Sequence, residues 1–297
     1  MRVVGRTRPD PGVEQAGPVK SWRKWFTKPL NIVLTIVVSA ATAVVVHYAI
    51  QVAGAPEQLD EFRTGTEIRA VVDQVHLDDE GATMATPAGV ELDGSMRARL
   101  DQPNVPTDTR FLADVRDLGG VQIWNLTLRI TLEGRRNQLI RVVDVAPRIV
   151  SREPPPAGTL LLMPAQGGDA ALRMLVDLDE PRPVLRLVVG DNPFDKKGGT
   201  PYFDANTISL KDNEQQVIVL RARSQRDLFR FDLTVTYQIG GETRHQTIDD
   251  GGKPFAVAGP SKTASGLLSY QHVHQLDNDY SLCELPNPQA VAEDSLC

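Results

Sequence analysis

The feature that most constrains this chain is an apolar run near its N-terminus. Residues 30–53 read LNIVLTIVVSAATAVVVHYAIQVA, 24 residues without Asp, Glu, Lys or Arg. As a helix rising about 1.5 Å per residue, this run would span about 36 Å, more than the bilayer hydrocarbon core of about 30 Å. The apolar region of a cleaved signal peptide is shorter, about 7–15 residues. The sequence therefore predicts a retained transmembrane helix over residues 29–54.

The flanks of the run predict its orientation. Residues 1–28 carry seven basic side chains against two acidic ones, and Trp22, Trp25 and Phe26 lie among the basic residues. Basic residues and interfacial aromatics are typical of the cytoplasmic end of a membrane helix. We therefore expect a single-pass protein of the cell membrane, with a short basic segment (1–28) in the cytoplasm and the rest of the chain outside it. His47 lies near the outer end of the run, where its ring can reach the interface; an intramembrane proton or ligand site is the alternative.

The remaining residues form an acidic portion. The whole chain has a net charge of -6, and residues 1–28 contribute +5, so residues 29–297 carry -11. Binding to nucleic acid requires a basic surface that neutralises phosphates. We therefore expect no nucleic acid as a partner. The expected partners are the lipid bilayer, through residues 30–53, and a protein or cell-wall component outside.

From residue 120 onward, the sequence has the two-residue period of β-strands. Apolar and polar residues alternate over 126–132 and again, with aromatic residues, over 229–237. About eight to ten such segments, separated by turns, predict a mainly β fold, an antiparallel β-sandwich of immunoglobulin-like architecture. Its topology stays open, because neither a cysteine pair nor a core tryptophan links two sheets.

We expect three regions outside the membrane. Residues 55–119 would form a membrane-proximal region, with a hairpin between 66–77 and 82–88 and a short helix that Thr107 or Asp108 caps and Gly119 ends. A helical spacing of apolar residues over 68–75 is the alternative to the first strand. Residues 120–258 would form the sandwich, with tight turns at Gly240-Gly241 and at IDDGG (248–252). Residues 259–297 would be a partly ordered C-terminal extension.

The segments GGVQIWNLTLRITLEGRRNQLIRVVDVAPRIV, GGDAALRMLVDLD and DDGGKPFAV carry a resemblance. Together with the apolar run, they make residues 110–258 similar to actinobacterial single-pass membrane proteins that have an extracytoplasmic β-sandwich domain. These segments are turns, proline corners and strands. The resemblance implies an anchored outer domain and no particular activity.

Two stretches contain side chains that bind metals elsewhere. In QHVHQLDND, the residues His272, His274, Asp277 and Asp279 resemble a zinc-type set, but a third ligand fixed by a core is missing from the pattern, and exposed polar residues explain it more simply. The loop 191–204 is acidic, yet Lys196 and Lys197 in its middle oppose calcium. We expect no metal and no cofactor.

Catalytic motifs are lacking as well. The sequence has no G-x-S-x-G elbow, no Ser-x-x-Lys at a helix start and no phosphate-binding loop. We expect no catalytic residues and a non-catalytic interaction or structural module at the cell surface. An extracytoplasmic hydrolase or a cell-wall glycan-processing accessory, with a site that no motif marks, is the alternative.

Two further expectations concern single side chains. In the loop 190–206, Phe194, Tyr202 and Phe203 could form an aromatic contact surface, or they could pack into the core. Cys283 and Cys297 could form a disulfide, closing a loop of about 15 residues worth about 3 kcal/mol, or they could be two separate thiols.

Overall fold

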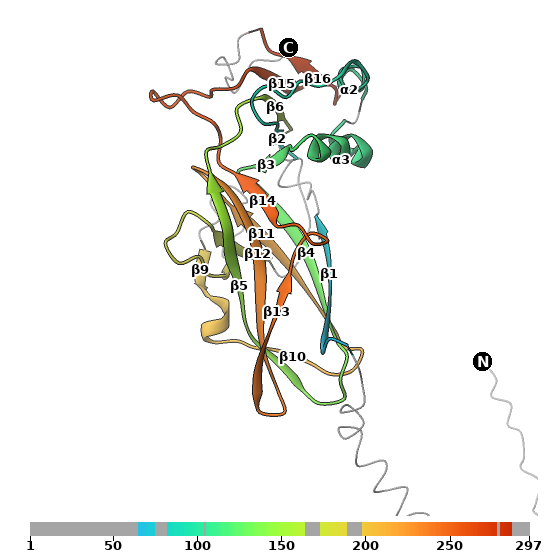
Figure 1. The fold of residues 1–297 in the computed structure, drawn as a ribbon, viewed down its shortest axis with the longest axis vertical. Helices are drawn as coiled ribbons and strands as arrows, with labels where there is room; N and C mark the ends of the chain where they lie inside the picture. Colours follow the sequence, from blue (N-terminus) through green and yellow to red (C-terminus); the bar gives the residue numbers. More distant parts are fainter. Residues whose placement is uncertain are drawn as a thin grey trace, which may run out of the picture. The chain divides into compact units, whose positions relative to one another are not determined.

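The computed structural model describes residues 65–74, 82–103, 105–163, 173–188, 198–277 and 280–286 (Figure 1). The predicted cytoplasmic segment, the predicted transmembrane helix and His47 lie outside the described residues. Within the described ranges, no helix combines the length and the apolar character needed to cross a bilayer. All of these ranges belong to one compact unit, which begins at residue 57.

The fold is mainly β and consists of two mixed sheets packed together. Sheet A has six strands, in the spatial order β1 (Ile68–Gln74), β4 (Asn125–Gly134), β11 (Gln215–Arg223), β7 (Arg173–Asp177), β8 (Arg186–Val188) and β9 (Gly198–Pro201). Sheet B has ten strands, in the order β10 (Ile208–Leu210), β5 (Ile140–Glu153), β12 (Leu228–Ile239), β14 (Phe255–Ala258), β3 (Val121–Ile123), β2 (Met84–Ala85), β6 (Thr159–Leu162), β15 (His272–Leu276) and β16 (Leu282–Glu284), with β13 (Glu242–Ile248) also paired to β12.

The core between the sheets follows the alternation in the sequence. On β4, Leu128 and Ile130 are buried at 0% and 1% exposure, and on β12, Phe231 and Leu233 are completely buried in the same cluster. Since successive strand residues point to opposite faces, the intervening polar residues face away from this core. The alternation predicted from the sequence for β4 and β12 is therefore confirmed.

The strand directions differ from the antiparallel sandwich that we expected. β7 pairs with β11 in parallel, as do β3 with β14 and β6 with β15. An immunoglobulin-like sandwich has antiparallel sheets, so this topology departs from it. Alternation shows which face of a strand is buried, but it does not show which strand lies beside it or in which direction.

The predicted hairpin within residues 66–88 is corrected by the strand pairing. β1 is a strand, as one reading of its sequence indicated, but it pairs with β4 in sheet A. β2 lies in sheet B, between β3 and β6. The two segments therefore belong to different sheets.

Two short helices cover the end of sheet B that is uppermost in Figure 1. The predicted helix is present as α3 (Thr109–Asp117), with Asp108 as its N-cap; its Oδ1 accepts the backbone N–H of Phe111 at 3.0 Å. The helix α2 (Gly94–Leu100), which the sequence did not lead us to expect, begins after Asp93. Arg99 joins the two helices, donating to Asp114 at 2.6 Å and to Asp108 at 2.7 Å. Two 3-10 turns complete the helical elements, η3 (Val105–Thr107) and η4 (Tyr202–Asp204).

Residues that we expected in a partly ordered extension complete sheet B. β15 pairs with β6, and β16 pairs with β15. Val273 and Leu282 are buried at 0% and 1% exposure. These strands have little alternation in sequence, since β15 is polar apart from Val273 and Leu276, which explains why the pattern did not indicate them.

Candidate functional site

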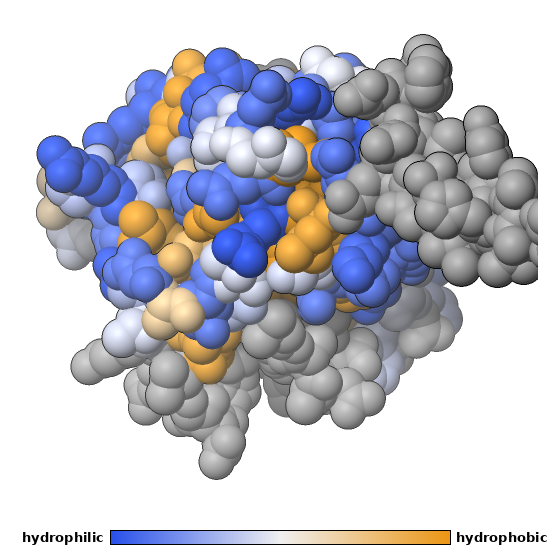
Figure 2. All heavy atoms as spheres, turned by 90° about the horizontal axis from the view of Figure 1, so that it is seen from below, coloured by the Kyte–Doolittle hydropathy of each residue, from blue (hydrophilic) through white to orange (hydrophobic). Residues whose placement is uncertain are grey.

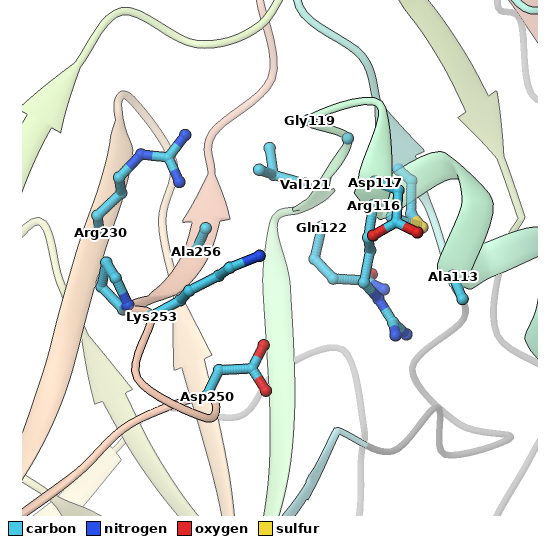
Figure 3. Close-up of a pocket in the computed structure, with 13 residues that line it drawn as sticks. Ala113, Arg116, Asp117, Gly119, Val121, Gln122, Arg230, Asp250, Lys253 and Ala256 are labelled. Carbon is cyan, nitrogen blue, oxygen red and sulfur yellow. The ribbon is translucent and has the colours of Figure 1, made fainter.

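A half-open cleft with a volume of about 560 Å³ lies where α3 meets sheet B (Figure 3). Its size is within the range of small-molecule sites, about 300–1,000 Å³. The residues that line it are Met84, Ala113, Arg116, Asp117, Gly119, Gly120, Val121, Gln122, Arg230, Asp250, Lys253, Pro254 and Ala256. They come from β2, β3, β12 and β14 of sheet B, from the end of α3, and from the turn before β14.

The end of α3 forms one wall of the cleft. The N–H of Gly119 donates to the carbonyl of Arg116 at 2.8 Å, and the N–H of Gly120 donates to that of Val115 at 2.9 Å. These two bonds and the positive φ of Gly119, 84°, define a Schellman motif, which ends the helix. A Cβ on Gly120 would lie 2.6 Å from the Val115 oxygen, so glycine is required there for close packing. The motif fixes Arg116 at the edge of the cleft.

A two-residue turn forms the opposite wall. Asp250 and Lys253 exchange backbone hydrogen bonds of 2.8 and 3.3 Å across Gly251 and Gly252, whose φ angles are 62° and 91°. Two successive positive φ angles are characteristic of a type I′ hairpin turn. The side chain of Asp249 supports the turn by accepting the N–H of Gly252 at 2.9 Å. The turn predicted at IDDGG is thus confirmed, and it brings Asp250 and Lys253 together at the cleft.

Three cationic side chains from separate elements meet at this cleft. In Figure 3, Lys253 points toward the middle of the cleft, with Arg230 and Arg116 on either side in this view. Arg230 lies on β12 opposite Ala256 of β14 and forms an ion pair of 3.6 Å with Glu153. Burial lowers the pKa of Arg116, and the nearby carboxylates partly offset this effect.

The lining combines these cations with two carboxylates, Asp117 and Asp250, and with the amide of Gln122. Such groups bind charged and hydrogen-bonding ligands. The lining contains no Ser, Thr, Cys, His or Tyr, and its side chains that can act as acids or bases are Asp117, Asp250 and Lys253. The arrangement is suited to recognition.

The aromatic residues that we singled out in the loop 190–206 lie elsewhere. Phe194 is outside the described residues. Tyr202 and Phe203 form η4, where their rings meet edge to face with centroids 4.9 Å apart. Both are half-buried and pack against the main core. Their position favours the structural reading of these two rings, and a binding role for them remains a prediction.

The histidines of the zinc-type stretch have other partners. His272 on β15 contacts Glu284 of β16, with Nδ1 and Oε1 separated by 2.8 Å, and this contact lowers the pKa of Glu284. His274 is half-buried, and burial lowers its pKa. Within the described ranges, which exclude Asp279, no group of three or more His, Cys, Asp or Glu side chains is arranged to hold a metal ion.

Other sequence-predicted residues are only partly placed. Cys283 is half-buried on β16, whereas Cys297 lies outside the described residues, so the disulfide remains a prediction. Most of the acidic loop 191–204 is also outside them, and Asp204 is exposed at the end of η4.

Exposed apolar side chains do not gather at the cleft. The large hydrophobic residues that are exposed in the described part of the chain are Val71, Leu118, Leu139, Ile149, Val150, Val217, Leu267 and Tyr280. They come from both sheets and from loops, and the face seen from below shows small apolar groups between polar ones (Figure 2). Surfaces that bind partners often have a continuous apolar patch. The cleft is distinguished instead by its charged lining and its concave shape.

Sequence reasoning missed the cleft residues. Arg116, Arg230 and Lys253 are far apart in sequence, and each lies on an ordinary polar position of a helix, a strand or a turn. The one signal was the turn IDDGG, which we interpreted only as a turn. Comparison with models of protein families, with curated proteins and with solved structures gives no match for this chain.

Proposed function

We propose that the protein is a membrane-tethered, non-catalytic binding module, and that the cleft between α3 and sheet B is its contact surface. The tether is the helix expected over residues 29–54, with the N-terminus in the cytoplasm and the two-sheet unit outside. The partner is a protein or a cell-wall component at the cell surface.

One observation carries the proposal: the cleft brings charged side chains from three elements together on a rigid support. Arg230 is fixed on a strand in the middle of sheet B, Arg116 by the Schellman motif, and Lys253 by a type I′ turn. Binding groups held by regular elements lose little conformational entropy on binding, which favours recognition.

The tether has a separate test. Protease added to intact cells or protoplasts should remove the folded unit and leave the N-terminal segment protected. Full protection of the folded unit would contradict the proposed topology. The cleft would then belong to a unit that does not face the outside of the cell.

The contact surface is tested by site-specific photo-crosslinking in cells. A photoreactive amino acid replaces Asp117 at the rim of the cleft, Phe203 in η4, or Val71 on the outer face of sheet A, where Val71 is 43% exposed. We expect one defined crosslinked species from position 117 and none from position 71. Crosslinking from position 203 alone would indicate that the contact surface lies at the aromatic loop and not at the cleft.

Enzymatic activity would contradict the proposal that the module is non-catalytic. The purified chain should give no turnover above background with ester, peptide, phosphate and glycoside substrates. Turnover that is lost with a substitution in the cleft would make the protein an extracytoplasmic hydrolase.

A further inference from the structure

We propose that the cleft binds a small ligand through one anionic oxygen group, a carboxylate or a phosphate, held between Arg116, Arg230 and Lys253. This inference rests on the proposed function, because it gives the chemistry that the same contact surface recognises. The ligand is either a free small molecule or the exposed acidic group of a larger partner.

The charge at the cleft differs in sign from the charge of the chain around it. Residues 29–297 carry a net charge of -11, but the cleft is lined by three cations and two carboxylates. A positive lining inside an acidic molecule concentrates anions at one place and leaves the rest of the surface repelling them. Guanidinium groups also offer paired N–H donors that match the two oxygens of a carboxylate or a phosphate.

The three cations reach the cleft from separate elements. Arg116 lies at the end of α3, Arg230 on β12 and Lys253 at the turn before β14, so they surround the cleft. Burial of the Arg116 guanidinium lowers its pKa, and the nearby carboxylates of Asp250 and Asp117 offset this effect only in part. A bound anion would add to this compensation and favour the charged form of the buried guanidinium. The ion pair of Arg230 with Glu153 is loose, at 3.6 Å between partly exposed groups, and an anion can replace it at small cost.

The carboxylates of the lining restrict the kind of ligand that fits. Asp117 and Asp250 belong to the same lining, and Asp250 follows Asp249 in the turn. Two carboxylates would repel a polyanion, whereas they would accept hydrogen bonds from hydroxyl or amine groups of a ligand with a single anionic group. Together with the volume of about 560 Å³, this favours a compact molecule or a single acidic group of a partner.

The test measures binding of two probes, sodium phosphate and sodium succinate, to the purified full chain in detergent. Isothermal titration and thermal unfolding are recorded at constant ionic strength set with sodium chloride. We expect saturable binding of at least one probe and a higher melting temperature. Binding of phosphate and not of succinate would show that the cleft recognises a phosphate group. Binding of succinate and not of phosphate would show that it recognises a carboxylate.

Three variants locate the binding. Lys253→Gln and Arg230→Gln remove one cation each, and Lys262→Gln removes an exposed lysine outside the cleft with the same change of net charge. Loss of one charge-assisted hydrogen bond should weaken the affinity about tenfold. Lys253 lies on an exposed turn, so its substitution tests the proposal even where a change at the half-buried Arg116 would impair folding.

The outcomes separate this inference from the proposed function. No saturable binding of either probe, or equal affinities for Lys253→Gln and Lys262→Gln, would overturn the inference. If position 117 still crosslinks to a partner in that case, the cleft remains the contact surface and only its ligand chemistry is wrong. Probe binding without any crosslink from the cleft would leave an anion site and contradict the proposed macromolecular partner.

Discussion

Gly120 connects the packing of α3 to the cleft, and replacing it by alanine should damage both. A Cβ at this position would lie 2.6 Å from Val115 Cγ1 and 2.6 Å from the Val115 oxygen, which accepts the Gly120 N–H. Non-bonded atoms do not approach so closely, and one of the two contacts is with backbone, which cannot rotate away. The helix end must therefore shift, and Arg116 must shift with it.

The expected cost follows from that clash. Overpacking a buried site typically costs 1–3 kcal/mol, and we take about 2 kcal/mol for Gly120→Ala. For a folded unit of this size, 1 kcal/mol lowers the melting temperature by about 2–4 °C, so a decrease of roughly 4–8 °C is expected. Binding of the anionic probe should weaken as well, because Arg116 no longer reaches its position.

Gly94 provides the matched control. It begins α2, and a Cβ there would meet no atom within 4 Å. Since alanine is the better helix former, Gly94→Ala should leave the melting temperature unchanged or raise it slightly. Thermal unfolding followed by circular dichroism compares both variants with the wild type. A melting temperature of Gly120→Ala within about 1 °C of the wild type would refute the described packing of the helix end.

Three further predictions concern the core, the base of the sheets and the cysteines. Leu128→Ala should cost about 2–5 kcal/mol in urea unfolding because Leu128 is completely buried between the sheets, whereas Val217→Ala, at a position 43% exposed, should cost less than about 0.5 kcal/mol. Burial raises the pKa of Glu67, but the hydrogen bond from the Tyr237 hydroxyl and two nearby arginines lower it more, so that the pKa lies below its ordinary value of 4.5. The ionised carboxylate therefore stabilises the fold above about pH 5, and this stability is lost as the pH falls through the lowered pKa. In Glu67→Gln, the free energy of unfolding should depend less on pH over that range. Non-reducing peptide mapping should recover Cys283 linked to Cys297, and Cys283→Ser should then cost about 3 kcal/mol; free thiols on both would refute the pairing.

The sequence was a good guide to the faces of the long strands. Leu128 and Phe231 lie in runs where apolar residues recur at every second position, and burial of one face is the direct cause of such a pattern. The same holds for the tight turns, since two adjacent glycines at 240–241 and at 251–252 adopt the positive φ angles that other residues avoid.

Strand partners and the cleft could not be predicted in this way. The parallel pairs join segments far apart in the chain, such as β3 with β14, and no local pattern encodes which of them meet. Likewise, Arg116 and Lys253 occupy polar positions that are ordinary for a helix end and a turn. Only the three-dimensional arrangement brings them to one cleft. For His272 and His274, the sequence pattern suggested a site that the fold does not assemble. Their spacing resembled that of metal ligands, but the partner of His272 is Glu284 on the neighbouring strand.

The central claim is that the charged cleft makes the contact with the partner, and charge reversal tests it most directly. Cells expressing the wild type, Lys253→Glu or Lys262→Glu are compared for the amount of the crosslinked species formed from position 117. The two variants change the net charge equally, and only Lys253 lines the cleft. We expect at least a tenfold loss with Lys253→Glu and an unchanged yield with Lys262→Glu, since reversing one contacting charge removes an attraction and adds a repulsion. An equal yield for both variants would contradict the account.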